Sequence, residues 1–300
     1  MVGHVQGRNV AEEGIISKGD FTKGAKHQAK DAAQSARPWM ERLARMGYAT
    51  EGAVYSLIGL LAAGAAFGSG GRATGQHGAL QVVAQSPFGS ILLGLISIGF
   101  LGYALWRGVQ TIADPDSEGT DVRALGKRVG YGAKALIYAG LAFSAVELVF
   151  GSAGEGGGTP DDWTALLLSW PLGQVLVVGV GIAVIGVGLR ELYQAYMARF
   201  LEYLKLDEMG ESLRKWTERW GRLGIAARGI VFGVVGSFLI RAALEYDPQE
   251  ARGLGGALKT LAHQPLGPWL LGAVALGLVA YGLFMLSVAR YRHIDTGRVQ

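Results

Sequence analysis

Three charged residues that recur at a regular spacing have the chemistry of an ion site inside a membrane. Glu51, Lys134 and Arg228 lie 83 and 94 residues apart, each near the start of a long apolar segment. Residues four apart share one face of a helix, and Tyr55 and Tyr138 follow the first two charges at that distance. If these faces converge, one carboxylate meets two basic groups where charged side chains are costly and often functional.

Several roles remain open for this candidate intramembrane charge cluster. The first interpretation is a structural ion triad, or side chains that extend to the nearby membrane surface. An anion or proton site and a site for lipid headgroups are the functional alternatives. The residue types do not decide among these roles, because each of them uses the same charges.

Two further pairs of opposite charge are predicted to be structural ion pairs. Glu147 and Arg241 share a repeat position near the outer end of two helices, and Arg107 and Glu191 share another near the cytoplasmic end. The first pair lies 13 residues beyond Lys134 and Arg228. That offset is about 220° around a helix, so the pair cannot share the face of the charge cluster.

Helices long enough to cross a bilayer must position these residues. Of the 300 residues, 50% are hydrophobic and 17% charged, and the mean hydropathy is +0.28. These values are too apolar for a typical soluble protein, and each crossing takes roughly 20 residues of helix. We predict an all-α integral membrane protein with six transmembrane helices, at about residues 47–67, 88–109, 131–150, 172–192, 225–244 and 266–288.

The predicted membrane helices form three copies of one helical hairpin. Pro87, Pro171 and Pro265 each belong to a Pro-x-Gly element, at intervals of 84 and 94 residues. Proline suits the first turn of a helix, where its missing N–H would have no partner, so each is predicted to begin the returning helix at the outer face. Short apolar segments before them are predicted to be outer interfacial helices. Parallel repeats of this kind can close around a pseudo-threefold axis or form an open row.

The repeats divide the chain into successive parts. We expect a polar, mobile cytoplasmic tail at 1–38, repeat 1 at 39–115, repeat 2 at 122–197, a cytoplasmic helical connector at 198–221, repeat 3 at 222–292 and a cytoplasmic tail at 293–300. Of the 28 Lys and Arg residues, 22 lie in the N-terminal segment, the C-terminal tail and two alternate junctions between spans, whereas the three opposite loops hold only three. The positive-inside rule then predicts cytoplasmic termini.

The basic residues also indicate the partners of the chain. The net charge of +4 reflects this topology and predicts an affinity for anionic lipids of the bilayer. Nucleic acid is not an expected partner, because the basic residues are not clustered on one recognition element.

The sequence contains no motif for a catalytic group, a cofactor or a metal. There is no Cys, which excludes thiolate nucleophiles and thiolate metal sites. The five His residues lie outside the predicted spans and lack paired metal-ligand spacing. No serine-nucleophile motif is present. We therefore predict no catalytic residues, no cofactor, no metal site and no enzymatic activity.

Three stretches carry a resemblance to a known family: ARMGYATEGAVYSLIGLLA, RVGYGAKALIYAGLAF and IAARGIVFGVVGSFLI. With the Pro-x-Gly elements, they resemble the bacterial membrane proteins called domain of unknown function 1206. The resemblance covers roughly residues 42–292, and it implies three two-helix repeats in the bacterial inner membrane but no activity. We expect a non-enzymatic scaffold or accessory subunit that binds lipid or a partner membrane protein. The alternative is a small transporter or channel with a polar site on the pseudo-threefold axis.

Overall fold

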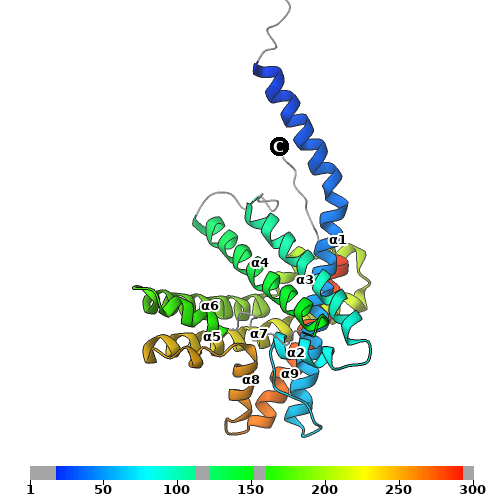
Figure 1. The fold of residues 1–300 in the computed structure, drawn as a ribbon. Coiled ribbons are helices and arrows are strands. Elements are labelled where there is room, and N and C mark those ends of the chain that lie inside the picture. The colour runs from blue at the N-terminus through cyan, green and yellow to red at the C-terminus, as the bar shows by residue number, and fades with distance from the viewer. Residues whose placement is uncertain (1–17, 113–121, 152–159, 293–300) are drawn as a thin grey trace, which may run out of the picture.

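Six long helices dominate the structure of the chain (Figure 1). The computed structural model describes residues 18–112, 122–151 and 160–292. The long helices are α1 (Lys18–Ala66), α3 (Gly89–Ile112), α4 (Val122–Val149), α6 (Gly173–Met197), α7 (Glu211–Glu245) and α9 (Gly267–Tyr291). Each contains a stretch long and apolar enough to cross a membrane. The predicted all-α fold with six transmembrane helices is therefore confirmed.

Each repeat contributes two long helices with a short helix between them. The short helices are α2 (Gln76–Ala84), α5 (Pro160–Leu168) and α8 (Leu254–Ala262), and a 3-10 turn, η3 (Pro248–Glu250), precedes α8. α1 begins within the predicted tail at 1–38. The first 17 residues of that tail and the predicted tail at 293–300 lie outside the described residues.

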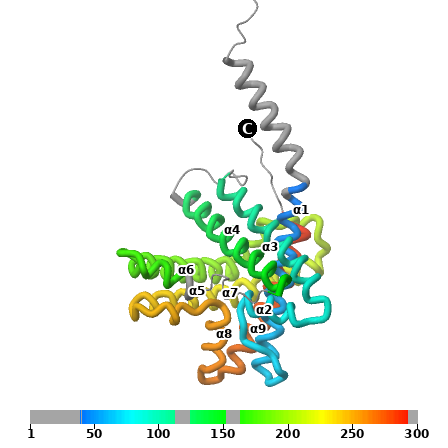
Figure 2. Tube along the Cα trace, viewed as in Figure 1, coloured from blue at the N-terminus to red at the C-terminus, as the bar shows by residue number. Residues whose placement is uncertain are grey.

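The second long helix of each repeat packs against the first long helix of the next. α3 packs along α4, α6 along α7, and α9 along α1, so the last repeat returns to the first. α1 also contacts α3, and α7 contacts α9. In the described ranges α4 and α6 barely touch, and Figure 2 shows them diverging. The repeats thus form a ring that is closed by α1 and α9 and open between α4 and α6.

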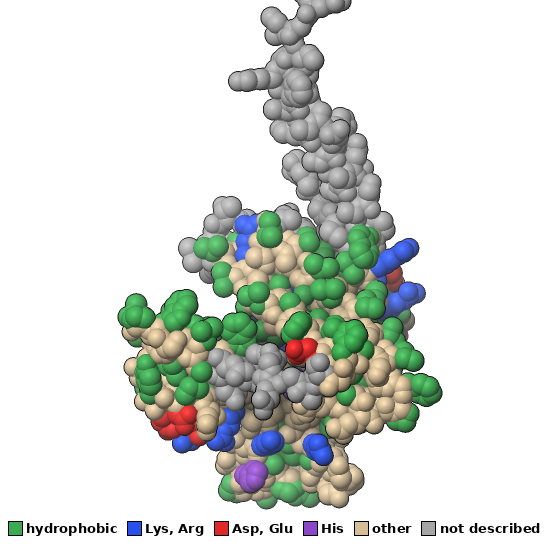
Figure 3. All heavy atoms as spheres, viewed as in Figure 1, with side chains coloured by type: hydrophobic (Ala, Val, Ile, Leu, Met, Phe, Trp, Pro, Cys, Tyr) green, Lys and Arg blue, Asp and Glu red, His purple; other side chains and the backbone are tan. Residues whose placement is uncertain are grey.

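Glycines let the paired helices approach each other closely. A Cβ on Gly188 of α6 would come within 2.6 Å of the carbonyl oxygen of Gly229 on α7. A Cβ on Gly52 of α1 would come within 2.8 Å of the carbonyl oxygen of Gly282 on α9. Lipid gives membrane helices no hydrophobic drive to associate, so close contact at small residues holds them together. Many large apolar side chains are exposed on the long helices, as a lipid-facing surface requires, and Figure 3 shows such side chains spread over one face of the molecule.

The Pro-x-Gly elements form turns, which corrects the predicted role of their prolines. The returning helices begin two residues after Pro87, Pro171 and Pro265. In two copies the intervening residue is left-handed, with φ of 63° at both Phe88 and Leu266, and a right-handed helix cannot include such a residue. The glycine permits the turn, because a Cβ on Gly89 would come within 2.5 Å of the Val83 carbonyl oxygen at the end of α2.

The connector predicted at 198–221 is not one helix. It contains two 3-10 turns, η1 (Arg199–Tyr203) and η2 (Leu206–Glu208), and α7 starts inside it. Ala198 ends α6 because its backbone is left-handed, with φ of 53°. Phe200 is buried edge-on against Phe284 of α9, with ring centroids 5.0 Å apart. The connector therefore folds back onto the bundle instead of extending away from it.

Candidate functional site

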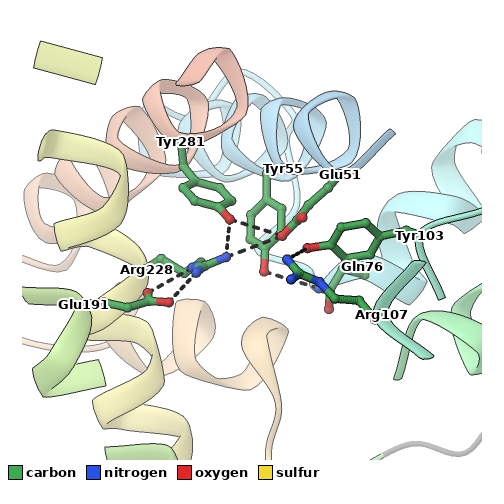
Figure 4. Close-up of polar contacts among 8 residues, drawn as sticks. All are labelled: Glu51, Tyr55, Gln76, Tyr103, Arg107, Glu191, Arg228 and Tyr281. Carbon is green, nitrogen blue, oxygen red and sulfur yellow. Dashed lines mark hydrogen bonds and ion pairs between the residues drawn. The ribbon is translucent and has the colours of Figure 1, made fainter. Parts of the chain in front are cut away.

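Arg228 on α7 is the centre of a buried ion cluster (Figure 4). Its Nε atom donates to Oε2 of Glu191 at 2.9 Å, and its Nη2 atom donates to Oε1 of the same residue. Its Nη1 atom lies 3.4 Å from Oε1 of Glu51 and also donates to the Tyr281 hydroxyl. That hydroxyl donates to the same Glu51 oxygen at 3.1 Å. The side chains of Arg228, Glu51 and Glu191 are only 11%, 3% and 6% exposed.

These side chains lie on four of the long helices, at the places where the helix backbones approach one another most closely. Glu51 on α1, Arg228 on α7 and Tyr281 on α9 directly precede Gly52, Gly229 and Gly282. Because the backbones nearly touch at those glycines, the neighbouring polar groups meet directly. Glu51 lies ten residues inside the span that begins at Glu41, or about 15 Å of helix from that end. The cluster therefore lies well inside the bundle.

Tyrosine rings surround the ion cluster. The rings of Tyr55 and Tyr281 meet edge to face, with centroids 4.9 Å apart. The Tyr55 hydroxyl accepts a hydrogen bond from Nε2 of Gln76 at 3.4 Å, which links α1 to the short helix α2. On the other side, Tyr138 of α4 packs edge to face on Tyr103 of α3 at 4.4 Å. Tyr55 thus connects the surroundings of the charged groups to the short helix α2.

Arg107 on α3 forms a second cationic centre on the far side of Tyr55 from Arg228 (Figure 4). Its Nη2 atom donates to the Tyr103 hydroxyl at 2.5 Å, and its Nη1 atom donates to Oε1 of Gln110 at 2.7 Å. The guanidinium also lies over the rings of Tyr103, Tyr131 and Tyr48, at 4.7, 5.4 and 5.8 Å from their centroids. Arg107 is 5% exposed. Within the described part of the chain, its Nε atom and Oε2 of Glu51 have no hydrogen-bond partner.

Lys134 on α4 lies in the same region but is not bonded to it. It is half-buried and within electrostatic range of Glu51, Glu191, Arg107 and Arg228. No described residue forms a hydrogen bond or an ion pair with its ammonium group. The region therefore holds three basic groups and two carboxylates, a formal excess of one positive charge.

The structure brings together some of the predicted site residues and separates others. Glu51 and Arg228 meet, whereas Lys134 remains outside their hydrogen bonds. The predicted Glu147–Arg241 pair does not form, because α4 packs on α3 and α7 on α6 and α9. Arg241 instead pairs on its own surface with Glu245 at 2.8 Å and with Glu250 at 3.7 Å.

The predicted Arg107–Glu191 pair does not form either. Each of these residues lies on the second long helix of its repeat, and each such helix packs against the first long helix of the next repeat. Glu191 therefore meets Arg228 of the next repeat, while Arg107 faces α4. Sequence reasoning had not singled out Tyr103 or Tyr281, although both occupy one repeat position and each bonds an arginine.

This arrangement is a buried ion-pair network that fixes the relative positions of the helices. Both carboxylates are bound to a guanidinium that is always charged, and a bidentate pair fixes the geometry as well as the charge. Among the described residues there is no group of three or more His, Asp and Glu that could hold a metal ion.

Comparisons with known proteins agree with the repeat structure. A family model described as Domain of Unknown Function (DUF1206) matches residues 46–114, 129–198 and 223–292. An uncharacterized protein of Bacillus subtilis (strain 168), YxxB, is 37% identical over 261 residues, which covers 87% of this chain and 94% of that protein. No solved structure matches.

Proposed function

This chain belongs to the DUF1206 family, whose description assigns no activity, and we propose from the site that it is a non-enzymatic membrane scaffold. In this role the six spans form a rigid platform for lipid or a partner membrane protein. The chain is a multi-span membrane protein. We place it in the bacterial inner membrane with both termini cytoplasmic, from the distribution of basic residues.

The observation that supports a scaffold is the packed ion cluster at the centre of the repeats. Glu51, Glu191, Arg228 and Tyr281 bond one another across four helices, and the tyrosines around them are buried. Such a network, once formed, opposes sliding of the helices, because any shift leaves a charge unpaired in a poorly hydrated place. This is the property of a fixed bundle and not of a moving gate.

The alternative is a small transporter or channel, and a specific observation favours it. Arg107 and Lys134 add positive charge beside the cluster without a carboxylate of their own in the described structure. Polar groups of this kind mark ion or proton pathways in other membrane proteins. A continuous path would also need hydrated polar groups toward the outer face, where the buried residues that follow Tyr138 on α4 are Ala142, Ser144 and Ala145.

Flux through purified protein separates these two functions. The chain would be reconstituted in liposomes that contain a pH-sensitive or chloride-sensitive dye, and an ion gradient would then be applied. The scaffold proposal expects proton and anion flux at the level of liposomes without protein. Protein-dependent flux that Glu51→Gln abolishes would instead establish the transporter.

A further inference from the structure

Two basic side chains, Arg107 and Lys134, lie within electrostatic range of each other at the α3–α4 contact, and the equivalent positions of the other two contacts between repeats hold no such pair. Arg107 on α3 and Lys134 on α4 occupy the repeat positions that Glu191 on α6 and Arg228 on α7 occupy one repeat later. The contact of α3 with α4 and that of α6 with α7 are also equivalent. At the α6–α7 contact these positions hold a bidentate ion pair.

The third copy of this position carries no second charge. Met285 on α9 stands where Arg107 and Glu191 stand in the other repeats, and it packs beside Gly52, next to Glu51. The equivalent positions thus hold a carboxylate and a guanidinium at the α6–α7 contact, a methionine and a carboxylate at the α9–α1 contact, and a guanidinium and an ammonium at the α3–α4 contact. Only the last combination repels itself, and it does so in a low-dielectric place where like charges are most costly.

The hydrogen bonds that Arg107 makes do not remove its charge. Tyr103 and Gln110 accept from its two terminal nitrogens through neutral groups, and its buried Nε atom has no partner among the described residues. A carboxylate or phosphate is the group whose geometry and charge match an arginine. The ammonium group of Lys134, which no described residue bonds, has the charge to hold another oxygen of such a group.

The site lies near one end of the bundle, on its open side. Arg107 is five residues from the end of α3 at Ile112, which is about 8 Å of helix. Arg128 stands nearer that same end, where its Nη2 atom donates to the Ile112 carbonyl at 3.2 Å. Lys134 is only half-buried, and its helix α4 barely touches α6 in the described ranges. An anionic group can therefore reach Lys134 without crossing the ion cluster.

We propose that Arg107 and Lys134 form a binding site for one anionic oxyacid group, a phosphate or phosphodiester, which enters from the end of α3 and α4. The group comes either from an anionic lipid headgroup or from free phosphate. The site goes beyond the scaffold role, since it assigns a ligand to two residues that do not belong to the hydrogen-bonded ion cluster around Arg228.

The test measures thermal unfolding of the full chain in lipid nanodiscs. One arm compares phosphatidylcholine discs with discs that also contain phosphatidylglycerol, and the other compares sodium phosphate with sodium chloride at equal ionic strength. We expect a rise in the unfolding midpoint of about 3 °C or more in at least one arm, since a ligand that binds only the folded state stabilises it. A rise with phosphatidylglycerol alone identifies the lipid, and a rise with phosphate alone identifies the free anion.

Three variants assign any such rise to the site. Lys134→Met should abolish the rise in the unfolding midpoint, and Lys134→Arg should retain it. Lys259→Met, on the exposed face of α8, should show the same rise as the unaltered protein. No rise in either arm for the unaltered protein would overturn the proposal, and so would an equal rise in Lys134→Met. If Lys134→Met does not fold, a Lys134→Arg protein without the rise counts equally against the proposal.

Discussion

Replacement of Arg228 by Met should destabilise the bundle more than any other single change at the site. Methionine keeps much of the side chain's length but leaves Glu51 and Glu191 buried without their shared cation. Removal of one partner of a buried pair typically costs about 3–5 kcal/mol. Because two carboxylates lose the same partner, we expect the upper end of that range, about 5 kcal/mol. The free energy of unfolding can be measured by titration with sodium dodecyl sulfate in mixed micelles.

Arg241→Met on the same helix is the matched control. Arg241 is exposed, and its ion-pair partners among the described residues are Glu245 and Glu250 at the protein surface, so the stability lost in Arg241→Met should be within experimental error. In the Arg228→Met background, Glu191→Gln should restore part of the stability, because it removes a stranded charge. A decrease in the free energy of unfolding below about 1 kcal/mol for Arg228→Met, or one equal to that of the control, would refute the stabilising role of the buried ion cluster.

The remaining predictions concern packing and topology. Gly188→Val should lower the free energy of unfolding by about 1–3 kcal/mol, because it disturbs the α6–α7 contact. Gly186→Val should not, because a Cβ on Gly186 would meet no atom within 4 Å. Equal unfolding free energies for the two variants would contradict this prediction. Gly267→Ala should lower the unfolding temperature more than Pro265→Ala does, because the new Cβ at residue 267 would collide with the carbonyl of Ala262. A larger decrease for Pro265→Ala would show that the proline is the main determinant of the turn. A single Cys in place of Ser69 should react with an impermeant reagent in intact cells, and reaction only after lysis would reverse the proposed orientation.

The spans and the repeat were predictable from the sequence because each has a strong local signal. Twenty apolar residues in a row need a bilayer or a large core, and the recurrence of Pro87, Pro171 and Pro265 with their glycines revealed the period. The position of the prolines was harder to predict. It depends on the left-handed backbone of Phe88 and Leu266. Bulky residues rarely adopt that conformation, so the residue types gave no reason to predict it.

The partners of the charged residues were less predictable. Repeat equivalence placed Glu51 and Arg228 in one group, and the two side chains lie close together, but it also suggested that residues of the same repeat position generally meet. In the structure the strongest pair, Glu191 with Arg228, joins different positions on neighbouring repeats. Apolar helices carry little pattern that reveals which neighbour they face. The glycines beside Glu51, Arg228 and Tyr281 were the available signal, since they mark where backbones touch.

The accessibility of one small buried residue tests most directly whether the interior of the bundle is packed. Ala142 lies eight residues beyond Lys134 on α4 and is buried, and a Cys at this position adds only one sulfur atom to the otherwise Cys-free chain. In proteoliposomes, Ala142→Cys should resist a small charged methanethiosulfonate reagent applied from both sides, while Ser69→Cys reacts fully. Reaction of Ala142→Cys at a rate close to that of Ser69→Cys would show that water enters the interior of the bundle and would contradict the scaffold.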